Sequence, residues 1–227
     1  MSKEETIKSD QVGGNKNDVT ILSQGQNDSF SSTVVTTQQQ KQRRRPCMHL
    51  IITNISKWAN IRSLLLTAAA FGCHTVFVAG QRKFDFNPNG KDYPNALRNY
   101  SLKIIQFDKL QDCIQSIQSQ QKNNERKIRI IGVEIDESSI DVENDNDAFM
   151  DNNTTNNTGT TTTTDVAFMM GNEGQGMNAK QMSFCDGFVR ISQYGGGTAS
   201  LNVNVAASIV LHRFQIWSRT IEYLHSK

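Results

Sequence analysis

Apolar residues along the chain fall into short runs whose spacing alternates between that of strands and that of helices. The mainly apolar run at 48–52 predicts a buried strand, and the run at 74–79 predicts a second one. Between them, apolar side chains recur at helical spacing over 61–71, and Gly72 follows as a natural stop. A strand, a helix and a strand in succession indicate parallel strands joined by a right-handed crossover.

The alternation continues along the chain after a predicted loop at 82–100, which contains Pro88 and Pro94. It predicts further strands at 103–107, 127–135, 166–170 and 187–191, and helices at 110–120, 179–183 and 201–224. The first half of the last helix is apolar on most of its circumference, so we expect it to be buried nearly all round. The pattern predicts an α/β fold with parallel strands.

Two segments lack this pattern. Residues 1–45 are rich in Gln, Ser, Asn, Thr and Lys and have almost no periodic apolar residues, which predicts a disordered tail. Residues 136–165 contain Asn and Thr tracts and are expected to form a long disordered insertion in a surface loop. A length of 227 residues favours one domain, which we place at 46–227 with this insertion inside it.

Charge is unevenly distributed. Eight of the 22 acidic residues lie in 136–165, which has no Lys or Arg, so the remainder is basic. A basic domain favours a polyanionic partner such as RNA, although an ordinary solvated surface explains the charge equally well.

Cysteine spacing and hydropathy exclude several classes of protein. The four cysteines are scattered, with no C-x-x-C pair and no histidine spaced for metal, so we expect no metal site and a reduced, intracellular protein. No stretch approaches the roughly 20 apolar residues of a membrane span. The early Glu4 and Glu5 argue against a transit peptide, which leaves cytoplasm or nucleus.

Two glycine-rich turns follow predicted strands, at 171–176 and 195–197. Such junctions are where open α/β sheets bind ligands. The first turn reads G-x-x-G-x-G and the second lacks the Lys-Ser/Thr of a P-loop, so neither matches a nucleotide fingerprint. Taken alone, each turn is more often a structural connection than a binding loop. A further alternative is an α/β protein unrelated to RNA, in which the turns bind another ligand.

Three segments taken together resemble the motifs of the SpoU family within the SPOUT methyltransferases. They are N-I-R-S-L-L-L-T-A-A-A-F-G at 60–72, G-N-E-G-Q-G at 171–176 and I-S-Q-Y-G-G-G-T-A-S-L-N-V-N-V-A-A at 191–207. The family patterns are N-x-G-x-x-x-R-T-A-x-x-F-G for the first and I-P-x-x-G-x-x-S-L-N-V-x-V-A-A for the third, which is the most specific. The resemblance covers about 46–222.

This resemblance implies a parallel sheet with helices on both faces and a C-terminal deep trefoil knot. It implies S-adenosylmethionine as cofactor, bound through backbone groups at Gly171, Ile191 and Leu201. The implied reaction is methylation of a ribose 2'-hydroxyl in RNA, with tRNA preferred over rRNA.

The resemblance further implies a homodimer to which the last helix contributes. Phe214, Ile216 and Trp217 on that helix would suit such a contact. Packing of these side chains within one chain is the alternative.

Polar residues at the family's positions are the candidate catalytic groups: Asn60, Glu173, Ser200 and Asn202. Because a ribose hydroxyl is a weak nucleophile, such side chains would orient it and help remove its proton. As alternatives, Asn60 would cap the helix at 61–71, Glu173 would be a solvated turn residue, and Ser200 and Asn202 would cap the last helix.

The first motif departs from the family at two positions. Leu66 stands where the family has arginine, and Arg62 stands where it has glycine. Residues four apart share a helix face, about 6 Å apart along the axis, so Arg62 is a candidate catalytic replacement. In the alternative, Arg62 is a surface residue and the chain is a catalytically silent RNA-binding protein. Ser192 also replaces the proline of the third motif.

A basic run precedes the first strand and contains Lys41, Arg43, Arg44 and Arg45. Arg213 and Arg219 add charge to the last helix. We take Arg43, Arg44, Arg45 and Arg213 as candidate RNA-binding residues. A nuclear address for the run, and a solvated face for the helix, are the alternatives.

Overall fold

The computed structural model describes residues 45–120, 127–150, 164–172, 174–195 and 200–224. They belong to one compact unit formed by 42–227, and a second unit, 1–41, lies outside the described residues. The expected tail at 1–45 is therefore described only at Arg45.

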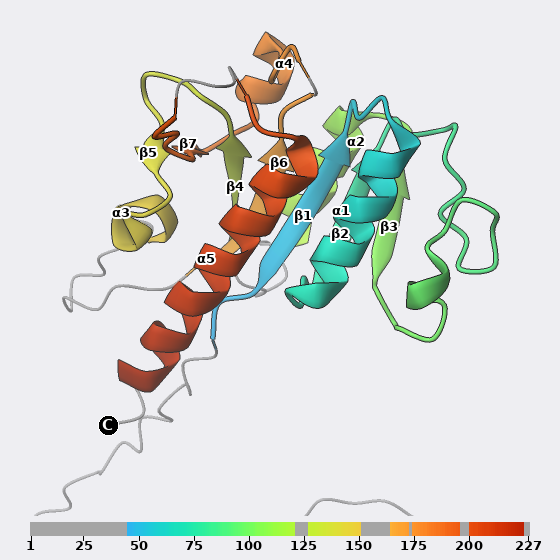
Figure 1. Ribbon diagram of the computed structural model, residues 1–227, viewed down its shortest axis with the longest axis horizontal. Helices are drawn as coiled ribbons and strands as arrows, with labels where there is room; N and C mark the ends of the chain where they lie inside the picture. The colour runs from blue at the N-terminus through green and yellow to red at the C-terminus, as the bar shows by residue number, and fades with distance from the viewer. Residues whose placement is uncertain (1–44, 121–126, 151–163, 173, 196–199, 225–227) are drawn as a thin grey trace, which may run out of the picture. The chain divides into compact units, whose positions relative to one another are not determined.

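A parallel sheet forms the centre of the fold (Figure 1). Its strands, in chain order, are β1 (Met48–Thr53), β2 (Thr75–Ala79), β3 (Ile104–Phe107), β4 (Ile128–Val133), β5 (Ile140–Asp141), β6 (Asp165–Met170) and β7 (Gly187–Arg190). The order across the seven-stranded sheet of the described residues is β3-β2-β1-β6-β4-β7-β5, and every pairing is parallel. All residues of the central β1 are buried, as expected for a strand covered on both faces.

Helices cover both faces of the sheet (Figure 1). On one face lie α1 (Trp58–Ala70), α3 (Asp145–Phe149) and α5 (Val203–Leu224), and on the other lie α2 (Leu110–Gln120) and α4 (Ala179–Met182). A short 3-10 helix, η1 (Asn95–Leu97), lies in the loop after β2. Because side chains alternate along β1, Leu50 joins the core under α1 and α5 whereas Ile51 joins the core under α2. The predicted α/β class with helices on both faces is confirmed.

Helix α1 begins at Trp58, three residues earlier than the sequence pattern predicts. Lys57 occupies the N-cap position without a side-chain hydrogen bond, and Asn60 lies inside the first turn. The alternative role of Asn60 as the helix cap is therefore wrong. The end of the helix agrees with the prediction, since Gly72 takes the left-handed conformation at φ +69°.

The acidic segment that follows β4 is ordered in its first half. Strand β5 pairs with β7, and α3 places the ring of Phe149 against Phe168 and Trp217, at centroid distances of 5.9 and 5.5 Å. The expectation of a disordered insertion is wrong for 136–150, because three apolar residues among the acids, Val142, Ala148 and Phe149, are buried. Residues 151–163 lie outside the described residues.

Helix α5 is less enclosed than expected. Val205, in its first half, is 45% exposed, so burial all round is wrong. Phe214 and Trp217 are 1% and 3% exposed and pack within the chain, which removes them from the surface expected to form a dimer contact. No helix in the described ranges is long and apolar enough to cross a membrane.

Candidate functional site

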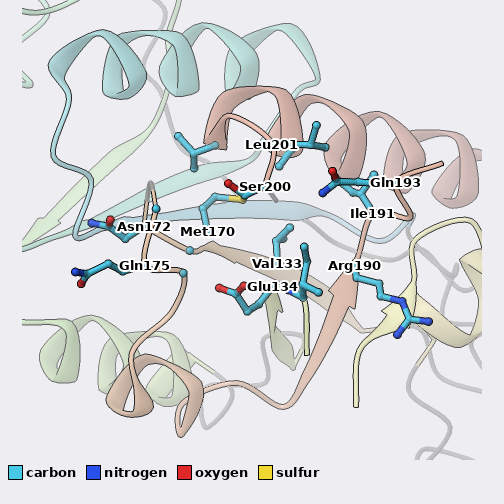
Figure 2. Close-up of a pocket in the computed structure, with 16 residues that line it drawn as sticks. Val133, Glu134, Met170, Asn172, Gln175, Arg190, Ile191, Gln193, Ser200 and Leu201 are labelled. Carbon is cyan, nitrogen blue, oxygen red and sulfur yellow. Dashed lines mark hydrogen bonds between the residues drawn. The ribbon is translucent and has the colours of Figure 1, made fainter. Parts of the chain in front are cut away.

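A cavity of about 380 Å³ opens at the carboxyl edge of the sheet (Figure 2). Its floor is formed where β4, β6 and β7 end, at Val133, Met170 and Arg190. The rest of its lining follows these strands in the chain: Glu134, Ile135, Gly171, Asn172, Gly174, Gln175, Gly176, Ile191, Gln193, Ser200, Leu201, Val203 and Ala206. Parallel strands end at one edge, so the loops that follow them meet there.

The glycine turn at 171–176 forms one wall. Asn172 and Gly176 exchange backbone hydrogen bonds of 3.0 and 3.1 Å, and Gly176 takes a positive φ of +65°. A Cβ atom on Gly171 would lie 2.7 Å from Oε2 of Glu134, so glycine allows the turn to approach this carboxylate.

Glu134 is fixed under the turn by the backbone. Its Oε2 accepts a hydrogen bond from the N–H of Met177 at 2.7 Å, and its Oε1 accepts one from Ile135 at 3.0 Å. Among the described residues that line the cavity, Glu134 is the one acidic side chain. In Figure 2, Ser200 and Leu201 lie on the side of α5, with Glu134 below them at the end of β4.

Glu134 was not among the site residues predicted from the sequence. The signal was present, since an acidic residue at the carboxyl end of a predicted parallel strand lies at the ligand-binding edge. The strand was predicted to continue to 135, which placed Glu134 inside it, whereas β4 ends at Val133.

The three expected cofactor contacts come together in this cavity. Gly171, Ile191 and Leu201 all line it, although they follow different strands or precede α5. The two segments most similar to family motifs are thus neighbours in space.

Of the candidate polar residues, one lines the cavity and two hold together the helices beside it. Ser200 lines the cavity. Asn202 Nδ2 donates to Oδ1 of the buried Asn60 at 3.3 Å, and Asn202 Oδ1 accepts from the N–H of Asn204 at 2.9 Å, which caps α5. Asn60 and Asn202 therefore join α1 to the start of α5. Glu173 lies outside the described residues.

Arg62 points to the loop after β2. Its Nε donates to the carbonyl oxygen of Asp92 at 2.7 Å, and its Nη2 donates to that of Lys91 at 3.0 Å. Leu66, one turn later, is 40% exposed. Neither side chain lines the cavity. Among the described residues, Arg62 therefore does not extend into the cavity as the sequence predicted.

The candidate RNA-binding arginines lie away from the cavity lining. Arg45 Nε donates to Ser218 Oγ at 3.0 Å, and Arg45 also hydrogen-bonds the Gln215 side chain. Arg213 Nη2 donates to the carbonyl oxygen of Glu143 at 3.2 Å. Arg43 and Arg44 lie outside the described residues.

The ordered acidic segment is attached to the third motif. Ser192, which replaces the family's proline, donates a hydrogen bond to the Asp141 carboxylate, and this bond is the largest cause of the lowered pKa of Asp141. Tyr194 donates to Glu143 Oε2 at 3.2 Å, and that contact raises the pKa of the Tyr194 phenol. These contacts position the residues next to the cavity-lining Gln193.

A family comparison matches residues 47–212 to the model described as the SpoU rRNA Methylase family. A comparison with curated proteins found no match.

Three solved structures are similar in fold. The SpoU methyltransferase AviRb from Streptomyces viridochromogenes, in complex with the cofactor AdoMet, is 20% identical with a TM-score of 0.58, over 78% of this chain and 59% of that one. The A. aeolicus TrmH/SpoU tRNA modifying enzyme is 17% identical with a TM-score of 0.54, over 82% and 81%. A structure concerning 2-OH methylation of C/U34 on tRNA is 14% identical with a TM-score of 0.57, over 77% and 98%. The chain thus spans about three fifths of the AviRb chain, and the likeness shows the fold.

Proposed function

Because the chain belongs to the SpoU rRNA Methylase family, we propose that it methylates a ribose 2'-hydroxyl of RNA with S-adenosylmethionine as methyl donor. The observation that carries this proposal is that described residues of the 171–176 turn and of the third motif line one and the same cavity. Its place at the carboxyl edge of a parallel sheet is the usual ligand site of such folds.

The residues of the cavity fit this cofactor. A volume of about 380 Å³ is in the range of small-molecule sites. Met170, Ile191 and Leu201 offer apolar surface for a flat base, and Glu134 offers negative charge for a cationic ligand. S-adenosylmethionine supplies a methyl group on a positively charged sulfur. The AdoMet complex of AviRb supports the assignment.

In the proposed reaction, the ribose oxygen forms a bond to the methyl carbon while the carbon–sulfur bond breaks, and the hydroxyl proton leaves to a base or water. We assign Ser200, at the cavity, to a hydrogen bond with the ribose. Asn202 and Asn60 are positioning residues, because their mutual hydrogen bond holds the start of α5 against α1. Glu173 is proposed as a further polar contact on the basis of the resemblance.

A catalytically silent RNA-binding protein is the second candidate function. The observation that favours it is the geometry of the first motif, in which Leu66 replaces arginine and Arg62 binds the carbonyl oxygens of Lys91 and Asp92. Under the first candidate, Arg62 acts by electrostatic stabilisation after leaving these carbonyls.

We propose tRNA ahead of rRNA as substrate. The support comes from the two tRNA-related structures, of which the chain covers 81% and 98%. An intracellular location, in cytoplasm or nucleus, follows from such a substrate. The deep trefoil knot in the C-terminal part is proposed from family membership.

We propose that the protein is a homodimer through exposed apolar residues of α1 and α5. Leu66 and Val205 are 40% and 45% exposed. They are adjacent in sequence to Thr67 and Asn204, which are joined by a 2.8 Å hydrogen bond, so they lie near each other. This pair replaces the buried Phe214 and Trp217 of the expected contact, whereas Ile216, the third residue expected there, is 42% exposed.

Incubating the full chain with S-adenosylmethionine labelled in its methyl group and with total RNA tests the function. Label at 2'-O positions in RNA of tRNA size is the expected result. Cofactor binding without transfer would select the silent RNA-binding protein, and absence of cofactor binding would overturn both candidates. Calorimetry with the cofactor alone separates these outcomes.

A further inference from the structure

A second cavity, of about 770 Å³, lies at the opposite edge of the sheet from the cofactor cavity. It is open to solvent and is lined mainly by the start of β1, the end of α1 and the second half of α5, which lie side by side in Figure 1. Four of its lining residues are arginines or histidines: Arg45, His74, His212 and Arg219. Among the described lining residues there is no Asp or Glu.

Helix α5 presents two of these groups on one face. His212 and Arg219 are seven residues apart, which is close to two turns, and both side chains are exposed. Arg45 reaches the same helix through Ser218 and Gln215. The arginines and histidines of the cavity therefore come from separate parts of the chain, which the fold brings together.

Two aromatic side chains, Phe71 and Tyr100, line the same cavity. The His212 ring contacts the ring of Phe71 at a centroid distance of 5.7 Å. Tyr100, on the same cavity, is 47% exposed. Cations that bind phosphates, mixed with aromatic rings on which bases stack, are typical of surfaces that bind single-stranded nucleic acid.

We propose that this cavity binds the backbone of the substrate RNA at a point remote from the reacting ribose. The inference rests on the proposed function for the identity of the ligand. A second copy of the chain is a poorer occupant, because a two-fold contact here would face like charges toward each other. The six residues of β1 separate the two edges by about 20 Å, so only a long RNA reaches both cavities.

The experiment compares long and short RNA on the full chain. The variants are Arg219→Gln, His212→Gln and their combination, with Lys180→Gln on the exposed surface of α4 as the matched loss of one charge elsewhere. The readouts are fluorescence anisotropy with full-length tRNA and with an oligonucleotide of about five nucleotides, at several salt concentrations, and calorimetry with S-adenosylmethionine.

The combined variant is expected to bind full-length tRNA about tenfold more weakly, and Arg219→Gln alone should reduce the salt slope by about one. Binding of the short RNA and of the cofactor should stay unchanged, as should all properties of Lys180→Gln. Unchanged tRNA binding in the combined variant, or an equal loss in Lys180→Gln, would overturn the inference. So would a change in molecular mass, since it would identify the cavity as a contact between copies.

Failure of the proposed function has a different signature. If the natural chain transfers no methyl group but the combined variant loses tRNA affinity selectively, the remote RNA site stands and the methyl transfer does not. If transfer occurs and no variant alters tRNA binding, the reverse holds.

Discussion

Gly171, which lines the cavity proposed to hold the cofactor, has a steric role that the addition of one methyl group tests. In Gly171→Ala, the new Cβ would lie 2.7 Å from Glu134 Oε2 and 3.3 Å from Gly176, so the turn or the carboxylate must move. We expect affinity for S-adenosylmethionine to fall at least about tenfold, or 1.4 kcal/mol, in calorimetry. Gly195→Ala is the control, because its Cβ would meet no described atom within 4 Å. Equal affinities for both variants would contradict the role of Gly171.

Arg62 decides whether the first motif is catalytic. If it stabilises the developing charge, Arg62→Ala should lower the methyl-transfer rate by about 10² to 10³ and leave cofactor affinity unchanged, because its side chain does not line the cavity. Leu66→Arg restores the family pattern. A gain of transfer in Leu66→Arg from an inactive natural chain identifies the silent protein. Full activity of Arg62→Ala removes Arg62 from the reaction and leaves it as a contact to the loop at Lys91 and Asp92.

A buried histidine makes stability depend on pH. Neither ring nitrogen of His49 has a hydrogen-bond partner among the described residues, and its pKa is lowered to about 3, first by burial and then by the positive charges of His74 and Lys103. An unfolded histidine titrates near 6.5, so between these values the unfolded chain binds a proton that the folded chain does not. The contribution of His49 to folding stability is therefore fully present above about pH 6.5 and is lost as the pH falls toward 3.

We expect protonation of His49 in the unfolded chain to lower the free energy of unfolding by about 2 kcal/mol at pH 5 relative to pH 7.5. Urea denaturation at the two pH values measures it. His49→Phe, which keeps a ring beside Phe77, should reduce the difference by this amount. The same pH dependence in both proteins would show that other groups cause it.

At the scale of elements, α3 connects the acidic segment to the core. Phe149 is 0% exposed and its ring contacts Phe168, Phe214 and Trp217. Phe149→Ala should lower the free energy of unfolding by about 3 to 5 kcal/mol, because it leaves a cavity among these rings. Asp147→Ala, exposed on the same helix, should change it by less than about 0.5 kcal/mol. A small effect of Phe149→Ala would show that the segment is dispensable, as its composition suggests.

At the scale of the whole molecule, the proposed dimer depends on apolar surface at Leu66 and Val205. Light scattering at micromolar concentration should give the mass of two chains, and Val205→Asp should give one, since it places a charge in the contact. Ile140→Asp, also exposed but on β5, is the control and should leave the mass unchanged. A monomeric mass for the natural chain would exclude the dimer.

The sequence alone determined the elements that depend on local periodicity. Strands β1, β2 and β6 and helix α2 lie within a residue or so of the predicted ranges, because buried strands and amphipathic helices impose short-range spacing on apolar residues. The end of helix α1 at Gly72 was also predictable from the sequence, because the left-handed conformation that ends the helix depends on the glycine itself. The resemblance to the family motifs also implied Gly171, Ile191 and Leu201 as cofactor contacts, and these residues line one cavity.

Only the tertiary structure decided the features that depend on partners distant in sequence. Composition marked 136–150 as disordered, yet burial of Phe149 depends on rings of β6 and α5. Helical spacing predicted that the side chain of Arg62 reaches the position expected for an arginine at Leu66. In the structure its guanidinium instead donates to carbonyl oxygens of a loop about 30 residues away. Glu134 joined the site because Met177 and Gly171 lie against its carboxylate. The second cavity brings together Arg45 and Arg219, which lie near opposite ends of the described part of the chain. Periodicity reports which face of an element is apolar, whereas the identity of what covers it depends on chain topology.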